Sequence, residues 1–164
     1  MGWGLAGWQA CSSRGIEELL PQFAAVMVDS IEVGADVVTF RVQARADDAA
    51  CSRCRRRSSR VHARYQRELS DLPVGGLPSR VIAAIRRFKC LNRRCAQSTF
   101  SEQIPGLTTP SARRTPPLTG ALVKVALSLA GRAGARLATG LAMPCCRDVQ
   151  IRLIRAQPLP DAGR

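Results

Sequence analysis

The stretch RRFKCLNRRCAQSTF (residues 86–100) decides how the rest of the chain is interpreted. It places two cysteines, Cys90 and Cys95, among five basic residues, with a phenylalanine on each side of the pair. A second close pair, Cys51 and Cys54, precedes it across a spacer of 35 residues. Each pair can turn two thiolates toward one point, and two pairs complete a tetrahedral ligand set for Zn²⁺. The spacing therefore predicts a structural zinc site formed by these four cysteines.

A disulfide framework and a redox-active pair are the alternatives to zinc. Seven cysteines are an odd number, which fits poorly with a closed set of disulfides, and no strand–helix context of the thioredoxin kind surrounds Cys51. Unliganded thiols remain open, as does replacement of one ligand by His62. Cys11, Cys145 and Cys146 fall outside the spacing. Because a site with four cysteine ligands has no open coordination position, its metal would be structural rather than catalytic.

Charge is distributed unevenly along the 164 residues. The formal net charge of +13 divides into −4 for residues 1–50 and +17 for residues 51–164. Thirteen basic and two acidic residues lie between Cys51 and Cys95. Because guanidinium groups suit phosphate oxygens, this cluster predicts a nucleic-acid partner. A merely solvated basic face is the alternative for any single arginine.

No membrane partner is expected. No stretch approaches the roughly 20 apolar residues that cross a bilayer, and the opening MGWGLAGWQAC lacks the basic n-region of a secretory signal. We expect a cytoplasmic, nucleoid-associated protein.

The hydrophobic pattern changes from strands to helices along the chain and predicts an α+β fold. We expect a disordered leader (1–18), with a short helical turn over 16–20 at its end. A β element with the four-cysteine finger, similar to a zinc ribbon, should follow in residues 19–100. Period-2 alternation predicts a hairpin of strands over 26–33 and 36–46, and a further strand over 77–88. Four prolines predict a linker over 101–117. Helices are expected over 118–130, 132–141 and 146–156, as a helix-turn-helix segment (118–157) before a tail (158–164).

Helical spacing predicts which side chains of the last two helices are buried. The expected buried stripes are Ala133, Leu137 and Leu141 on one helix and Cys146, Val149 and Leu153 on the next, with Arg147, Ile151 and Arg155 roughly opposite. The small residues Ala133, Gly134 and Ala138 permit close helix approach. Ala142 stands where a helix-turn-helix often has glycine, and Cys146 is a poor N-cap. From the pattern alone, a helix-turn-helix and a plain helical hairpin used in packing or dimerisation are equally supported.

The order of several short motifs, from about residue 19 to 158, resembles the N-terminal part of bacterial insertion-sequence transposases of the ISL-three family. The motifs are C-x2-C at Cys51 and Cys54, RVHARY (60–65), DLPVGG (71–76), RRFKC-x4-C-x4-F-x-E (86–102), ARRT (112–115), GRAGARLA (131–138) and CRDVQIRLIR (146–155). The resemblance implies a small β element, a zinc finger and a helix-turn-helix, with CRDVQIRLIR in the place of the recognition helix. The chain departs from the family at Arg55 and Ala142, where glycine is usual, and at Cys146, where serine is usual.

Family members resemble enzymes that cut DNA with an acidic triad holding Mg²⁺ on an RNase-H-like domain, which would begin after Pro158. We therefore expect a truncated transposase: a DNA-binding fragment that recognises insertion-sequence ends and is not itself an enzyme. A zinc-finger protein-interaction or regulatory module without a role in transposition is the alternative.

The implied partners are double-stranded DNA, above all terminal repeats, and a second copy or an intact transposase. The expected DNA contacts are Arg55, Arg56, Arg86, Arg87, Arg93 and Arg94 in the finger, and Arg132, Arg136, Arg147, Ile151, Arg152 and Arg155 in the helices.

Overall fold

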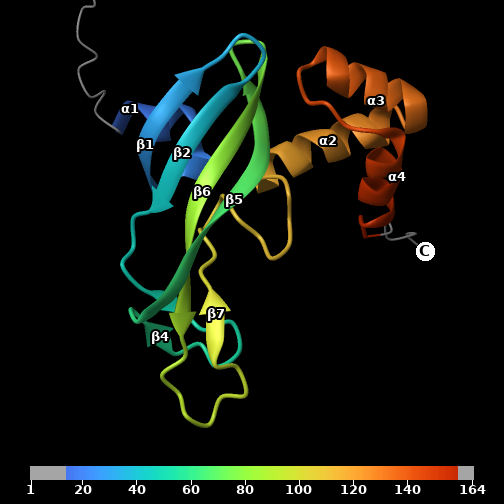
Figure 1. The fold of residues 1–164 in the computed structure, drawn as a ribbon. Helices are drawn as coiled ribbons and strands as arrows, with labels where there is room; N and C mark the ends of the chain where they lie inside the picture. Colours follow the sequence, from blue (N-terminus) through green and yellow to red (C-terminus); the bar gives the residue numbers. More distant parts are fainter. Residues whose placement is uncertain (1–13, 159–164) are drawn as a thin grey trace, which may run out of the picture.

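The computed structural model describes residues 14–158 (Figure 1). Its helices are α1 (Arg14–Leu19), the 3-10 turn η1 (Pro21–Phe23), α2 (Pro116–Ser128), α3 (Gly131–Gly140) and α4 (Arg147–Arg155). Its strands are β1 (Val26–Val33), β2 (Val38–Ala44), β3 (Ala49–Ala50), β4 (Arg57–Ser58), β5 (Val61–Val74), β6 (Leu77–Lys89) and β7 (Thr99–Ser101). Most of the expected leader and tail lies outside the described residues. Helix α1 overlaps the helical turn expected over 16–20 and begins two residues earlier, within the leader that was expected to be disordered.

The main sheet has the strand order β1-β2-β6-β5, and β7 pairs with β6. The predicted hairpin of β1 and β2 is confirmed as an antiparallel pair, and β2 runs parallel to β6. A two-residue turn joins β5 to β6, and both of its residues, Gly75 and Gly76, have positive φ (59° and 80°). A tight hairpin turn of this kind needs that conformation, which glycine adopts at no steric cost. The Gly-Gly pair thus fixes the register of the longest hairpin in the described chain.

Strand β6 contributes to two hydrophobic cores on opposite faces. Val81, Ala83 and Ile85 are buried in the main core with residues of β2 and η1. Phe88 is buried in a second, smaller core with Phe100 and the cysteine loops. Because side chains alternate along a strand, residues 85 and 88 point to opposite sides. One continuous strand therefore carries the cysteine end of the molecule rigidly on the main sheet.

Residues 101–117 differ from the predicted free linker. Ile104 and Leu107 are buried in the main core, and Thr115 is fully buried. The Ser70 N–H donates to the Arg113 carbonyl at 3.0 Å, and the Thr115 N–H donates to the Ser70 carbonyl at 3.0 Å. Pro105 and Pro110 disfavour regular secondary structure but leave the apolar side chains free to pack, whereas Pro116 and Pro117 lie in the first turn of α2. The segment is an ordered strap along β5.

Asp71, a buried carboxylate on β5, connects three parts of the fold. It accepts a hydrogen bond from Gln22 Nε2 of η1 at 2.8 Å and another from the Thr115 hydroxyl. Thr115 is the N-cap of α2, and its Oγ1 accepts from the Leu118 N–H at 3.4 Å. The hydroxyl of Thr115 therefore couples the start of the helical segment to the sheet.

We expect Thr115→Val to lower the free energy of unfolding by about 1–2 kcal/mol, because it removes an N-cap and leaves a buried carboxylate oxygen without its donor. Urea unfolding of the zinc-loaded protein followed by circular dichroism measures the change. Thr139→Val is the matched control, since that exposed hydroxyl donates to the Ala135 carbonyl within α3 and its loss should change stability by less than about 0.5 kcal/mol. Equal effects of both substitutions would contradict the role of Thr115.

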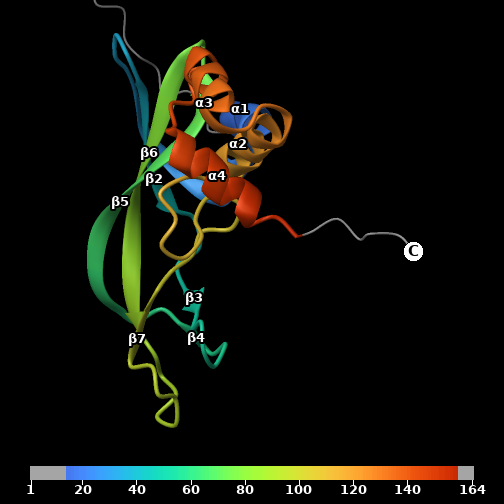
Figure 2. The same cartoon turned by 90° about the vertical axis from the view of Figure 1, so that its right-hand side faces the viewer.

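Helices α2, α3 and α4 pack on one another beside β5 (Figures 1 and 2). Their shared core contains Leu118, Leu122, Ala138 and Met143, and Leu153 packs against it. The three predicted helices are thus present, with boundaries shifted by one or two residues.

The predicted buried stripe of α3 is wrong. Leu137 and Leu141 are 40% and 48% exposed, and Ala133 is exposed as well. Gly134 and Ala138 face inward instead, because the main chain of Leu129 lies too close to this face for a larger side chain. On α4, Val149 and Leu153 are half-buried, Cys146 is exposed, and Gln150, which the pattern did not single out, is fully buried.

Candidate metal centre and nucleic-acid interface

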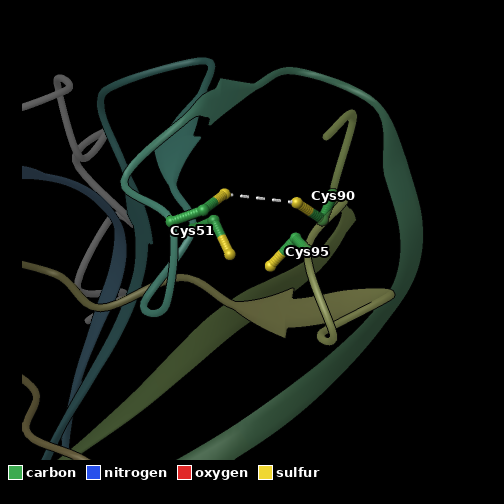
Figure 3. Close-up of side chains that lie close together, drawn as sticks. Cys51, Cys90 and Cys95 are labelled. Atoms are coloured by element: carbon green, nitrogen blue, oxygen red, sulfur yellow. Dashed lines mark hydrogen bonds between the residues drawn. The ribbon is translucent and has the colours of Figure 1, made fainter. Parts of the chain in front are cut away.

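Two loops bring the four predicted metal ligands together. Cys51 and Cys54 lie between β3 and β4, and Cys90 and Cys95 lie between β6 and β7. All four sulfur atoms lie within 4.8 Å of one another, and Cys54 Sγ is 3.6 Å from Cys90 Sγ. Figure 3 shows the thiols of Cys51, Cys90 and Cys95 turned toward a common point.

The donor set fits a structural zinc ion. A Zn–S bond of about 2.3 Å in a tetrahedral site implies sulfur–sulfur distances of about 3.8 Å, close to the Cys54–Cys90 distance of 3.6 Å. Four thiolates would fill the coordination sphere, so the ion would hold the two loops together without activating water. Within residues 14–158, the four cysteines are the one group of three or more potential metal ligands that lie close enough to share an ion.

The thiols affect one another's ionisation. The Arg56 backbone N–H, together with the neighbouring thiols and Asn92, lowers the pKa of Cys54 to about 6. The Asn92 backbone N–H by itself lowers the pKa of Cys90, but desolvation and the three other thiols outweigh it and raise that pKa to about 12. Several thiolates cannot lie this close without a cation, because each disfavours the ionisation of the next. A divalent ion removes that repulsion, so metal binding would release protons from the cluster.

Backbone hydrogen bonds shape both cysteine loops. In the first, the Arg55 N–H donates to the Cys51 carbonyl at 2.9 Å, and Arg55 has a φ of 63°. In the second, the Gln97 N–H donates to Cys95 Sγ at 3.5 Å. The Ser52 hydroxyl donates to Gln97 Oε1 at 3.0 Å and thereby connects the loops. The left-handed conformation of Arg55 explains why glycine would suit this position.

Ala142, between α3 and α4, also has a left-handed backbone, with a φ of 56°. We expect Ala142→Gly to raise the free energy of unfolding by about 0.5–1 kcal/mol, because glycine removes the steric cost of the left-handed backbone. The larger conformational entropy of glycine in the unfolded chain offsets only part of this gain. Thermal unfolding of the zinc-loaded protein measures the difference. Ala133→Gly, at an exposed position within α3, should instead destabilise by about 0.5–1 kcal/mol. A loss of stability in both variants would contradict the strain at Ala142.

Arg86 is held inside the protein. Its side chain is 16% exposed and pairs with Glu102, which is 3% exposed, through Nη2 and Oε2 at 2.7 Å. It also donates to the Ala46 carbonyl and lies 5.2 Å from the centre of the Phe88 ring. The hydrogen-bonded Glu102 carboxylate raises the pKa of Arg86. Arg86 serves this internal contact, and not the phosphate contact that the sequence predicted.

The other predicted DNA contacts form two groups. Arg55, Arg56, Arg87, Arg93 and Arg94 are exposed around the cysteine loops, whereas Arg132, Arg136, Arg147, Arg152 and Arg155 are exposed on α3 and α4. Ile151 is half-buried. The first group lies at the end of the β5–β6 hairpin far from its turn, and the helices lie beside the other half (Figure 1). The structure therefore presents two separate basic surfaces.

Sequence reasoning missed the residues that position the site. The 14-residue strand β5 was not assigned, because arginine and glutamate interrupt its alternation. Glu102 and Asp71 carried no signal beyond their place in short motifs. Gln150 was also missed: it is fully buried, and its Nε2 donates to Cys145 Sγ at 3.1 Å.

Two cysteine loops joined by a β-hairpin, with a small aromatic core beneath them, define a four-cysteine zinc ribbon. Residues 47–95 match the family model described as the zinc-finger of transposase IS204/IS1001/IS1096/IS1165. The match covers 49 of the 164 residues and supports the resemblance to the N-terminal region of ISL-three transposases; α2, α3 and α4 lie outside it. No curated protein and no solved structure matches the chain. Within residues 14–158, no helix combines the length and apolarity that a membrane crossing requires.

Proposed function

We propose that this chain is the DNA-binding part of a transposase, which recognises insertion-sequence ends through the zinc ribbon and a helix-turn-helix formed by α3 and α4. The observation that carries the proposal is the four-cysteine cluster inside a segment that matches a transposase zinc finger. The high positive charge, which lies almost wholly in residues 51–164, supports a polyanionic partner.

The exposed arginines of α4 support a role for this helix in contacting base edges. Arg152 and Arg155 are exposed on this helix and take part in none of the ion pairs formed within residues 14–158. Arg147 pairs with Asp148 at 3.3 Å, where both side chains are more than half exposed, and so weak a pair gives way easily to a phosphate. The opposite side of α4 packs on α2 and α3. A helix with one packed face and one cationic face can lie in a major groove.

Binding rather than cutting is the proposed activity of this part of the protein. The arginines of the ribbon would contact phosphates and fix the register, and α4 would contact base edges. The proposed partners of this part of the protein are double-stranded terminal repeats and, on the nucleoid DNA, a second copy of the chain or an intact transposase.

Fluorescence anisotropy with a labelled 30-base-pair duplex tests the proposal. The zinc-loaded chain should bind, and the logarithm of its association constant should fall linearly with the logarithm of salt concentration, because phosphate contacts release counterions. Replacing Arg152 and Arg155 together by glutamine should weaken binding by about 30-fold or more, because each contact of an arginine with a base edge contributes about 1–3 kcal/mol. The matched control replaces Arg41 and Arg80, two surface ion-pair residues of the sheet. Absence of duplex binding by the wild-type chain at low salt would refute the proposal.

A protein-interaction module is the second candidate, and one observation favours it. Four leucines of the helical segment are exposed, namely Leu127, Leu129, Leu137 and Leu141, at 62%, 44%, 40% and 48%. If they form a contact between copies, light scattering should give a dimer mass for the wild-type chain and a monomer mass for a Leu137→Ser, Leu141→Ser variant. A module of this class would keep its partner when the α4 arginines are replaced.

A further inference from the structure

The motif RVHARY (residues 60–65) forms the start of β5, and the proposed function gives it no role. Strand β2 stops pairing with β6 at the Gln43–Ala84 pair, so the hairpin continues beyond the main sheet. Over residues 61–66, no strand of the described chain pairs with the outer edge of β5. The extension is therefore a two-stranded ribbon with β7 on its β6 side. We call residues 60–66 and 84–89 the extended ribbon.

Both faces of the extended ribbon reach solvent along β5. His62, Ala63, Arg64, Tyr65 and Gln66 are all exposed, although a strand in a stable sheet ordinarily buries one face. A register shift between Val61 and Ala63 turns the strand over at His62. Before the shift, Val61 packs against the small aromatic core of Phe88 and Phe100. After the shift, the side chains of residues 63–66 are exposed to solvent. Bulges often redirect side chains in this way next to functional sites.

The extended ribbon carries cations without partners. Arg60, Arg64, Arg87 and Lys89 take part in none of the ion pairs within residues 14–158, and no acidic residue lies in the ribbon. Arg64 stands directly across from Arg86 in the hairpin, and like charges in this position are destabilising. Glu102 neutralises Arg86 and leaves Arg64 without a counterion. The charge of Arg64 is therefore available to pair with an anion supplied from outside.

Tyr65 distinguishes the extended ribbon from a merely solvated basic surface. It is 44% exposed, whereas the four phenylalanines of the described residues are at most 3% exposed. Tyrosine hydroxyls are frequent donors to DNA phosphates. Tyr65 is thus an exposed aromatic residue that lies among arginines without ion-pair partners, on a strand with a free edge. Such a combination is typical of a surface that contacts nucleic acid.

We propose that the extended ribbon is a second duplex-binding surface, seated in the major groove beside the contacts of α4. The ribbon has two strands at residues 64–66 and 84–86, and β7 adds a third strand at residues 87–89. Neighbouring strands lie about 4.8 Å apart, so the two-stranded part with its side chains fits a groove about 12 Å wide. Arg60 and Arg64 contact the phosphates that border the groove, and Tyr65, which leaves β5 on the face opposite Arg64, contacts the backbone from the other side of the strand. The helical segment joins the same edge of β5 at Ser70, so one duplex along this edge meets both surfaces. This inference rests on the proposed DNA-binding function.

Salt-dependent anisotropy on the zinc-loaded full chain tests the extended ribbon. The variant Arg60→Gln, Arg64→Gln should reduce the salt slope by about 1.8 and weaken binding to a mixed-sequence 30-base-pair duplex at 0.1 M salt by about 60-fold. The control variant Arg41→Gln, Arg80→Gln removes the same charge from the sheet and should stay within about twofold of wild type. Because Arg60 and Arg64 are exposed, both variants should keep one zinc per chain and the wild-type melting temperature.

The outcomes distinguish the proposed DNA-binding function of the chain from the proposed contact made by the extended ribbon. If the wild-type chain binds and the variant at Arg60 and Arg64 behaves as the control does, the extended ribbon is not a contact surface, while the proposed function stands. If the wild-type chain binds no duplex, both fail. A photo-crosslinking benzoylphenylalanine in place of Tyr65 should attach to the duplex, and the same group in place of the exposed Gln43 should not. Equal cross-linking at the two positions would overturn the placement of the ribbon.

Discussion

Chelation of zinc, or replacement of Cys90 by serine, is expected to unfold the cysteine end of the molecule. The second core consists of little more than Cys51, Phe88 and Phe100, too few apolar side chains to hold two loops against their conformational entropy. Structural zinc sites contribute about 10–16 kcal/mol in small zinc-finger peptides, so the loss should exceed any other single change in this chain. The stacked pair of Phe88 and Phe100, with ring centres 5.9 Å apart, should open to solvent.

Elemental analysis and hydrogen exchange measure this effect together. The wild-type chain, purified under reducing conditions without chelator, should carry one zinc per chain, and the Cys90→Ser variant should carry much less than one. Amide protection should be lost over residues 49–62 and 88–100, while β1, β2 and the first half of β6 retain it through the main core. Cys146→Ser is the matched control, because that exposed thiol lies outside the cluster. Full protection in a zinc-free wild-type chain would contradict a structural metal.

Gly134→Ala is the second large effect. An ideal Cβ at this position would lie 1.9 Å from the Leu129 carbonyl oxygen and 3.3 Å from Gln150 Oε1. The first of these atoms is main chain, which cannot rotate away as a side chain does. The corner between α2 and α3 must open, and the packing of Ala138 against Leu118 and Leu122 loosens with it. We expect a loss of about 3 kcal/mol or more, at the upper end of overpacking costs.

Gly120→Ala is the control for Gly134→Ala. Gly120 lies within α2, where a Cβ would meet nothing within 4 Å, so alanine there should stabilise the helix by about 0.5–1 kcal/mol. Chemical unfolding gives the two free energies, which should differ in sign. Two-dimensional NMR spectra of Gly134→Ala should show the largest shifts in α2, α3 and α4 and small ones around the cysteines. Stability equal to wild type at position 134 would contradict the close approach of the helices.

Local chemistry made the metal site predictable. The Cys-x2-Cys and Cys-x4-Cys pairs specify ligands by spacing alone, and the structure places all four sulfurs together. The resemblance to the transposase family marked Arg55 and Ala142 as residues standing where glycine is usual, and both have positive φ. These features depend on a few neighbouring residues, which is why sequence reasoning reaches them.

Features that depend on distant partners were not predictable. The assignment of Arg86 to phosphate failed because its partner Glu102 lies 16 residues away, directly after β7. The stripe of Ala133, Leu137 and Leu141 is the more apolar side of α3, yet the side with Gly134 and Ala138 is buried. Close helix approach decided the orientation of α3, and hydrophobicity did not. The long strand β5 was not predicted because its residues 62–66 are exposed on both faces, so they show no alternation of apolar and polar side chains.

The two glycines of the β5–β6 turn have a consequence for how the cysteine pairs find each other. Counted along the chain, 35 residues separate the two pairs, and the entropy of closing so long a loop slows assembly. If the hairpin forms first at residues 75 and 76, each further cross-strand contact between β5 and β6 shortens the loop that remains to be closed. The two cysteine pairs are then brought together at the open end of the hairpin. The length of the spacer is then set mostly by strand residues, since β5 and β6 contribute 14 and 13 of its 35 residues. It can change without harm only by equal additions to both strands, because one extra residue in either strand alone reverses the side to which every later side chain points.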